Sequence, residues 1–358
     1  MKNSVIFLLF LLLVVLRYFS SRPVYNVGDT LRVSGKVTTE PTSYDFSQRV
    51  SLLGLSFYLP NFPEVGYGDV IVVEGKVAKD KSGKRLILDN PKLVSLKTSE
   101  GKLISFRRKV IAFYRRSLPE PHSSLVAGVA LGSKSNIPEV FWNSLKKSGT
   151  AHVVVASGTN VTLVAGFAMG IILLFFRRRV AVVASIAVIW LYAVMAGFDA
   201  PIVRAAVMGS LLFVSQIFGR MATGLRILVI SALTMLVVRP DWLGDLGFWM
   251  SFTATASLML FGKTFDRLFR KVPSLLREGL STSFAAQIGV APILYYAFGY
   301  VSIWSPFVNM LVLWVIPYIT VVGIAAGLVG VVFGPLGQVA LYLIYPLTSW
   351  FVWIINLF

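Results

Sequence analysis

Long runs of apolar residues recur through this chain and constrain its fold more than any other feature. They occupy 4–19, 150–176, 180–198, 201–218, 225–238, 245–262, 280–298, 303–330 and 335–356. A hydrocarbon core of about 30 Å is crossed by about 20 apolar residues in a helix. Hydrophobic residues make up 56% of the 358 positions and charged residues only 14%. The sequence therefore predicts a polytopic α-helical membrane protein with about nine crossings.

The charged residues between these runs indicate how the chain crosses the membrane. Basic groups at Arg177–Arg179, Arg220, Arg226 and Lys263–Arg277 follow alternate runs, and Asp199, Asp241 and Asp245 stand at the opposite ends. Basic loops mark the cytoplasmic side. The pattern predicts a cytoplasmic N-terminus and an external location for 22–98 and for the C-terminus. We expect residues 1–21 to stay as a transmembrane anchor; a cleaved signal peptide is the alternative.

Residues 22–98 have the pattern of a small β domain. The expected strands are Leu31–Thr38, Arg49–Tyr58, Asp69–Val77, Arg85–Leu88 and Lys92–Leu96. Residues 27–37 and 68–77 repeat one sequence pattern: a Gly-Asp turn is followed by an alternating strand that ends in Gly-Lys-Val. Five short strands favour a small external OB-like β-barrel. Such a barrel either binds single-stranded nucleic acid through aromatic rings or is purely structural. The available rings are Tyr44, Phe46, Phe57, Tyr58 and Phe62.

Residues 99–119 combine apolar and basic positions, which predicts a basic amphipathic helix in the membrane interface. A short apolar piece at Ser123–Gly132 follows and predicts a re-entrant or interfacial helix. The basic residues lie on the expected external side, where the rule for cytoplasmic loops does not explain them. They attach the chain to lipid headgroups, or they steer a polyanion to the membrane. The DNA-binding candidates are Arg107, Arg108, Lys109, Arg115, Arg116, Lys146 and Lys147.

Polar residues inside the apolar runs point to a functional site. The segment 149–162 is rich in them, and Gly158 offers a place where a helix can break. Polar groups at membrane depth are costly unless they meet partners or line a wet path. The lining candidates are His152, Ser157, Gly158, Thr159, Asn160, Thr162, Arg204, Asp245, Ser251, Gln287 and Asn309. For Arg204 the alternative is a structural ion pair with Asp199.

Four of these segments resemble motifs of the ComEC-type competence family, the inner-membrane DNA uptake channel of transformable bacteria. Residues 149–158 resemble its His-x-x-x-x-Ser-Gly signature, and 199–208 its Pro-x-x-Arg-Ala-x-x-Met helix. Residues 245–254 resemble its Asp-x-Gly-Phe-x-x-Ser-Phe-x-Ala segment, and 285–309 its Ala-x-Gln…Pro…Phe…Ser…Asn stretch. The resemblance implies a channel domain at 120–358, and the anchor and barrel at 1–98 are similar to the family's N-terminal part.

This chain departs from the family pattern in two ways. The signature commonly continues Ser-Gly-Leu-His, but here Thr159 and Asn160 follow, and asparagine does not titrate near neutral pH. Larger members carry a metallo-β-lactamase-like domain, whereas these 358 residues hold no His-x-His-x-Asp-His cluster. The chain resembles a short form without nuclease activity. With no cysteine and two histidines, we also expect no metal site and no cofactor.

The leading function is therefore passage of single-stranded DNA across the bacterial cytoplasmic membrane, with membrane lipid as a second partner. Nothing in the sequence resembles an ATP-binding loop, so we expect a separate cytoplasmic ATP-driven motor. A separate external DNA receptor or nuclease is also expected, and a homodimer stays open. One rival is a transporter of small anions. Another is an intramembrane hydrolase with Ser157 and His152, which a five-residue spacing would put on different faces of one helix.

Overall fold

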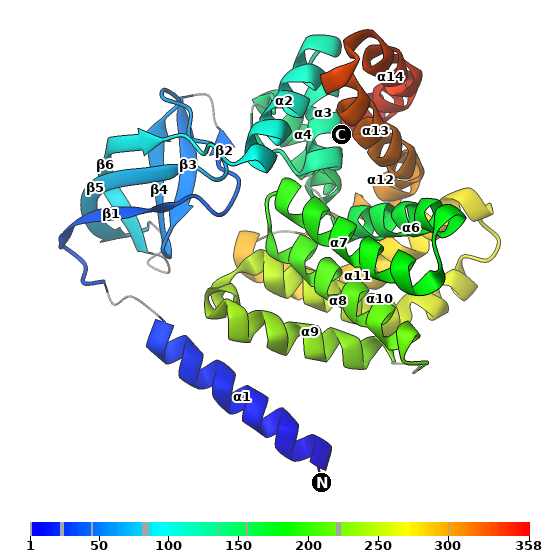
Figure 1. Cartoon of the computed structure of the whole chain (residues 1–358), viewed down its shortest axis with the longest axis horizontal. Coiled ribbons are helices and arrows are strands. Elements are labelled where there is room, and N and C mark those ends of the chain that lie inside the picture. The colour runs from blue at the N-terminus through cyan, green and yellow to red at the C-terminus, as the bar shows by residue number, and fades with distance from the viewer. Residues whose placement is uncertain are drawn as a thin grey trace.

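The molecule combines a small β-sheet part with a larger assembly of helices. The computed structural model describes residues 2–21, 25–43, 46–80, 86–135, 137–154, 157–219, 223–299 and 301–358. Figure 1 shows the sheet on the left, the helices on the right and helix α1 (Lys2–Ser21) at the bottom. Arg17 Nε of α1 donates to the carbonyl of Val237, 3.2 Å away. This bond ties the first helix to the larger assembly.

Six strands form one mixed sheet in the order β1-β5-β6-β4-β3-β2. The strands are β1 (Thr30–Lys36), β2 (Thr42–Ser43), β3 (Ser47–Leu52), β4 (Leu55–Pro60), β5 (Val70–Lys79) and β6 (Leu86–Lys97). All neighbours are antiparallel except β4 and β6, which pair in parallel. Alternate residues point inward, as expected of strands with one buried face. Leu55, Phe57 and Ile71 are fully buried in the resulting core.

The two segments that share this repeated pattern, 27–37 and 68–77, pair with each other. β1, from the first segment, runs antiparallel to β5, from the second segment. At one end, Gly28 N donates to the Val77 carbonyl at 2.8 Å and Val77 N donates to Asp29 O at 2.9 Å. At the other end, Val37 exchanges the same two bonds with Asp69 and Gly68, at 2.8 and 2.9 Å. Each Gly-Asp turn is therefore hydrogen-bonded to the last residue of the other segment, which gives the repeated sequence pattern a structural role.

Two predicted strand boundaries are wrong. The stretch 49–58 is a hairpin rather than one strand, because Leu53 and Gly54 both have positive φ angles, 50° and 84°, and turn the chain. Two consecutive positive φ angles are typical of the tight turn that matches the twist of a hairpin. Conversely, the pieces predicted at 85–88 and 92–96 belong to the single strand β6.

The remaining residues form helices. They are α2 (Lys102–Ser117), α3 (His122–Leu131), α4 (Glu139–Ser148), α5 (Ala151–Val154), α6 (Gly158–Phe175), α7 (Arg178–Met195), α8 (Ala200–Ile217), α9 (Gly224–Val238), α10 (Leu246–Leu268), α11 (Ser274–Phe298), α12 (Ser305–Val312), α13 (Ile316–Val332) and α14 (Gly334–Asn356). The short 3₁₀ helices η1 (Pro240–Gly244) and η2 (Leu313–Val315) complete the set.

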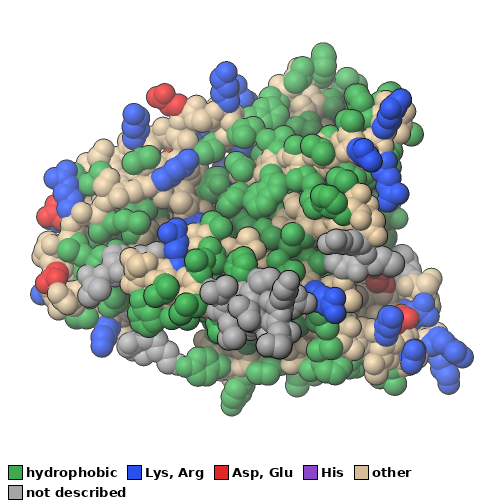
Figure 2. Space-filling view, turned by 60° about the horizontal axis from the view of Figure 1, so that its bottom comes forward, with side chains coloured by type: hydrophobic (Ala, Val, Ile, Leu, Met, Phe, Trp, Pro, Cys, Tyr) green, Lys and Arg blue, Asp and Glu red, His purple; other side chains and the backbone are tan. Residues whose placement is uncertain are grey.

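Five helical stretches in the described part of the chain are long and apolar enough to cross a membrane. They are Ala151–Phe175, Arg178–Met195, Ala200–Ile217, Ser305–Val332 and Gly334–Asn356. Shorter apolar helices lie at Phe10–Ser20, His122–Leu131 and Gly224–Val238. Hydrophobic side chains also cover much of the face in Figure 2, with Lys and Arg mostly toward its edges. These features are compatible with a membrane protein, while the number of nine crossings stays a prediction.

Helix α3 is buried along its whole length, from His122 to Leu131. Its neighbours include α2, α13 and α14, and its side chains belong to the largest hydrophobic cluster of the molecule. A ten-residue helix is too short to cross a bilayer, as the sequence indicated. Other helices surround it, and its placement as a re-entrant or interfacial helix stays a prediction.

Helix α2 is amphipathic as predicted, but protein covers its apolar face. Tyr114 Oη donates to the Gly323 carbonyl of α13 at 2.8 Å. A Cβ added at Gly327 would collide with Tyr114 and Val110, and one at Gly330 would collide with a neighbouring ring of α2. The small residues of α13 thus form a groove in which α2 lies. The apolar stripe of α2 therefore packs mainly against protein, and the location of this helix in the membrane interface stays a prediction.

Candidate functional site

Three sequence motifs that lie far apart along the chain meet at Arg204. This residue lies one turn inside α8, and its Nε donates to Ser251 Oγ of α10 at 2.7 Å. Its Nη1 is 3.5 Å from Met208 Sδ on the next turn of α8. A Cβ placed on Gly158, at the start of α6, would be only 2.6 Å from Arg204 Nη2. Glycine at this position lets the guanidinium lie against the helix start.

Arg204 has no carboxylate partner among the described residues. None of the ion pairs in that part of the chain includes it, although its side chain is half-buried. The sequence alternative, a pair with Asp199, is wrong, because Asp199 Oδ2 instead accepts from Lys134 Nζ at 2.6 Å. A cation enclosed by helices without a counter-charge is costly to maintain. The arrangement is suited to an anion that supplies this charge.

The helix breaks next to Gly158, as the sequence indicated. α5 ends at Val154, and Ser157 is extended, with φ −104° and ψ 166°, before α6 begins. His152 therefore lies on α5 and Ser157 is the N-cap residue of α6, so the rotation argument that separated them on one helix no longer applies. His152 Nδ1 is 3.0 Å from the Gly149 carbonyl. Ser157 Oγ is bonded to Thr159 and Asn160 rather than to the histidine.

The lining candidates on α6 occupy different environments. Asn160 is fully buried, and its Nδ2 donates to the Val129 carbonyl of α3 at 2.8 Å. This bond joins α6, directly after the family-like segment 149–158, to α3. Thr159 and Thr162 are exposed, and Thr162 Oγ1 donates to the carbonyl of Gly158 at 3.1 Å. In this conformation, Asn160 connects two helices, and the threonines are available at the surface.

Asp245 is exposed and caps α10. Its Oδ1 accepts from the backbone nitrogen of Phe248 at 2.8 Å, which satisfies one of the free N–H groups of the first turn. Asp245, the lining candidate that begins the family-like segment 245–254, is therefore the N-cap of α10. The same helix carries Ser251 to Arg204 less than two turns further on.

A second polar cluster surrounds Gly149. Gln287 Nε2 of α11 donates to the carbonyl of Ser302 at 3.0 Å, and Ser305 Oγ of α12 donates to the Gly149 carbonyl at 3.2 Å. Asn309 Nδ2 lies 3.4 Å from Ser305 Oγ. Gly149 has φ +74°, and an added Cβ would be 2.7 Å from the Cβ of Ser305. The cluster thus brings together Gln287, Asn309 and the segment before His152, but not Arg204.

The basic candidates divide into buried and exposed groups. Arg107 is 3% exposed, and its Nη2 lies 2.9 Å from Glu40 Oε2, so no polyanion reaches it in this structure. Arg108 pairs with Asp69, the residue directly before β5. These two residues fasten α2 to the small sheet, which removes Arg107 from the DNA-binding candidates. The exposed members are Lys109, Arg115, Arg116, Lys146 and Lys147.

Lys134 is the principal charged residue that the sequence analysis missed. Burial lowers the pKa of its ammonium, but the attraction and hydrogen bond of Asp199 outweigh this effect. Glu40 and Asp245 add to the attraction, so its pKa lies above the ordinary 10.5. In the sequence, Lys134 is a single lysine in a polar stretch between a predicted apolar helix and Pro138, a pattern that gives little indication of a buried ion pair. Among the described residues no group of three His, Cys, Asp or Glu side chains could hold a metal ion.

Comparison with known proteins agrees with the motifs. The chain is 27% identical over 220 residues to ComE operon protein 3 of Bacillus subtilis, an alignment covering 61% of this chain and 27% of that protein. It is 25% identical over 245 residues to the uncharacterized protein YcaI of Escherichia coli, covering 65% and 32%. The chain thus matches about a third or less of each relative's length. No solved structure matches. The model of the competence protein family matches residues 129–358, which contain Gly158, Arg204 and Ser251, and the chain therefore belongs to this family.

Proposed function

We propose that this protein forms the channel through which a single DNA strand crosses the bacterial cytoplasmic membrane during natural transformation. Membership of the competence family and the likeness to ComE operon protein 3 support a role in DNA uptake. The observation that carries the channel proposal is Arg204, a half-buried guanidinium without a carboxylate partner in the described structure. A passing phosphate would supply the missing negative charge.

The surroundings of Arg204 suit a moving strand better than a tightly held anion. The groups nearest to it are the hydroxyl of Ser251, the thioether of Met208 and the start of α6 at Gly158. One fixed cation next to neutral groups attracts a phosphate without trapping it, which is the compromise that conduction requires. The free N–H groups of a helix start add a weak attraction for anions. DNA would therefore pass Arg204 one phosphate at a time.

The small sheet fits an external OB-type barrel in this proposal. Its mixed order, with β4 parallel to β6, accompanies a contact of β1 with β3 that brings distant parts of the sheet together. OB-type barrels are small, partly open sheets that bind oligonucleotides. Arg239 Nη2 lies 3.4 Å from Thr38 Oγ1, and Lys134 joins Asp199 on the same side. The helix ends predicted to be external thus face the sheet, which supports a multi-pass topology with a cytoplasmic N-terminus. The number of nine crossings rests on the apolar runs of the sequence.

The partners follow from the same proposal. The exposed DNA-binding candidates of α2 and α4 (Lys109, Arg115, Arg116, Lys146 and Lys147) would meet lipid headgroups or arriving DNA. Translocation would need a separate cytoplasmic ATP-driven motor and a separate external DNA receptor or nuclease. The protein itself would act as a channel and not as an enzyme. A homodimer is compatible with this arrangement but is not required by it.

Substitution of Arg204 tests the channel. Arg204→Ala should lower the transformation frequency of a host that lacks its own copy by at least about tenfold, because one charge-assisted contact is worth about 1.5–3 kcal/mol. Arg204→Lys should retain part of the activity, since the charge remains. Arg226→Ala, at an exposed arginine outside the site, is the matched control. Full uptake by Arg204→Ala at a normal membrane level would refute the proposal.

A transporter of small anions is the second candidate, because it would use the same cation. The two functions separate in vesicles that contain the purified protein. A small-anion transporter would accumulate labelled phosphate or chloride, and Arg204→Ala would abolish this flux. A DNA channel would leave such flux unchanged while the same substitution lowers DNA uptake.

A further inference from the structure

A groove of about 420 Å³ lies between α10 and α11, near the turn that joins these two helices. Figure 1 shows this turn in yellow at the right, on the far side of the helices from the sheet. The basic residues of Lys263–Arg277 predict that this end of the two helices is cytoplasmic. The groove is distinct from the site at Arg204, since no residue of that site lines it.

Small residues keep the groove open. Leu258, Gly262 and Asp266 follow one another at intervals of four positions and therefore lie on one face of α10. A Cβ added at Gly262 would meet only the side chain of Leu258 within 4 Å, so the space next to this glycine is empty. On α11, the lining residue Ser281 is also small, and it is buried. A large side chain at Gly262 would fill the groove.

Two cations of the groove have no ion-pair partner in the described part of the chain. Lys263 and Arg267 lie one turn apart on α10, are exposed, and belong to none of the ion pairs found there. Asp266 does not neutralise them, because its Oδ1 lies 3.1 Å from Arg277 Nε. Glu278 is the remaining carboxylate of the lining. The groove therefore has an excess of positive charge, which attracts an anion.

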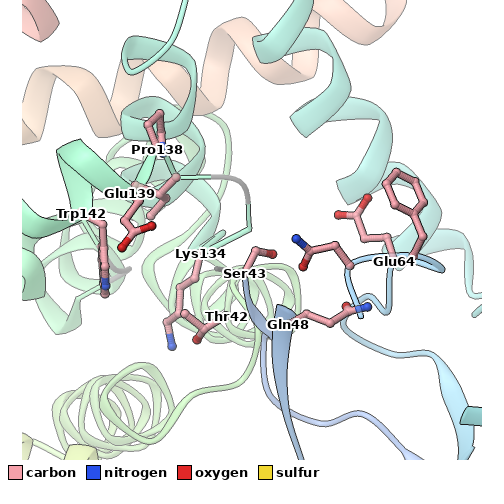
Figure 3. A pocket seen from close by; sticks show the side chains of 11 residues that line it. Thr42, Ser43, Gln48, Glu64, Lys134, Pro138, Glu139 and Trp142 are labelled. Atoms are coloured by element: carbon pink, nitrogen blue, oxygen red, sulfur yellow. The ribbon is translucent and has the colours of Figure 1, made fainter. Parts of the chain in front are cut away.

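The pocket where the sheet meets the loop before α4 differs in this respect (Figure 3). Lys134 is the one cation among its described lining residues, and its Nζ lies 2.6 Å from Asp199 Oδ2. An anion in that pocket would have to compete with a carboxylate that is already in place. The groove between α10 and α11 offers two cations without such a competitor.

An apolar surface continues from the groove along α10. The side chain of Leu260 is 59% exposed, and those of Leu258 and Phe261 are each 38% exposed. Exposed apolar side chains of a membrane helix contact acyl chains, whereas Lys and Arg near a helix end extend to the level of the headgroups. Within five residues, α10 thus changes from a surface suited to acyl chains to one suited to phosphates.

We propose that this groove binds an anionic phospholipid of the phosphatidylglycerol type. The headgroup phosphate would lie between Lys263 and Arg267, and a headgroup hydroxyl would donate to the carboxylate of Glu278. One acyl chain would follow the apolar surface that begins at Leu258. Basic pockets between helices on the cytoplasmic side are typical sites for anionic headgroups. The proposal goes beyond the channel and does not depend on DNA passing Arg204.

The test uses the full-length protein in a neutral detergent and native mass spectrometry, which resolves each bound lipid. The probe is phosphatidylglycerol, and phosphatidylcholine with the same acyl chains is the reference lipid. Lys263→Gln with Arg267→Gln should weaken the first phosphatidylglycerol site about tenfold to thirtyfold, the effect expected of two cations near a headgroup. Gly262→Leu should weaken it without any change of charge, because leucine fills the groove. Neither variant should change the affinity for phosphatidylcholine.

Matched controls exist for both variants. Arg178→Gln with Arg179→Gln removes two exposed arginines at the start of α7, also predicted to be cytoplasmic, and Gly166→Leu adds leucine where a Cβ meets nothing within 4 Å. Both controls should bind phosphatidylglycerol as the wild type does.

Equal affinities of the groove variants and their controls would overturn the proposal. It would also be overturned if inorganic phosphate displaced the lipid at equal concentration, because the groove would then bind the free anion. A third contrary result is unchanged lipid binding by the groove variants together with a lost affinity for a labelled Glu-Gly-Glu-Gly-Glu peptide, which would indicate an acidic protein partner.

Discussion

Replacing Gly158 by alanine perturbs the contact between α6 and Arg204 with a single methyl group. The new Cβ would lie 2.6 Å from Arg204 Nη2 and 3.3 Å from Ala205 Cβ, where ordinary contacts begin at 3.4 Å. The guanidinium has to retreat, and its 2.7 Å bond to Ser251 Oγ is lost if that distance exceeds about 3.5 Å. A hydrogen bond of a charged group is worth about 1.5–3 kcal/mol. We therefore expect DNA uptake to fall by about 10-fold to 100-fold.

The assay is transformation frequency in a host without its own copy, with the membrane level of each variant measured by immunoblot. Gly166→Ala is the matched control, because Gly166 is on the same helix and its added Cβ would meet nothing within 4 Å. Gly166→Ala raises the helix propensity of α6 by about 1 kcal/mol, whereas Gly158 is the first residue of α6 and gains less from alanine. A loss of uptake by Gly158→Ala therefore reports the contact with Arg204. Ser251→Ala should lower uptake less in the Gly158→Ala background than alone. Equal uptake by the two alanine variants would refute the reasoning.

Three further outcomes follow from the packing. Arg107→Gln should cost about 3–5 kcal/mol by leaving a buried carboxylate unpaired, and limited proteolysis should then release the small sheet. Gly327→Ala should lower the Tm because its Cβ collides with α2, while Gly334→Ala, with nothing within 4 Å, should not. The stabilisation from Lys134, whose folded pKa is raised, is complete below pH 10.5 and lost as the pH rises through that pKa. The Tm difference from Lys134→Met should therefore be constant between pH 7 and about 10 and shrink above this range.

Local sequence patterns predicted the classes of structure well. Hydropathy indicated a helical membrane protein, and each predicted run coincides with one or more helices. Alternation and turn residues indicated a small sheet near the N-terminus. The break at Gly158 and the amphipathic α2 were also anticipated, because both depend on residues within a few positions of one another. Strand boundaries at Leu53 were missed, since a non-glycine residue with positive φ leaves little trace in a sequence.

The partners of the polar residues were less predictable. Asp199 is five positions from Arg204, but its carboxylate meets Lys134, which is 65 positions away. Arg107 looked like a surface cation and is buried against Glu40, in the connection between β1 and β2. Each of these outcomes depends on the rotation of a helix and on what packs against it. Neither quantity is encoded in the spacing of nearby residues.

By itself, the sequence determined that this is a membrane-type helical chain with a small sheet, and that its polar residues lie in four family-like segments. Hydropathy and short-range spacing suffice for such statements because they follow from the geometry of single helices and strands. The tertiary structure decided that Gly158, Arg204 and Ser251 meet, that Asn160 joins α6 to α3, and that no ion pair among the described residues includes Arg204. The physical reason is that a charge is satisfied by what surrounds it in space, and helices distant in sequence provide those surroundings.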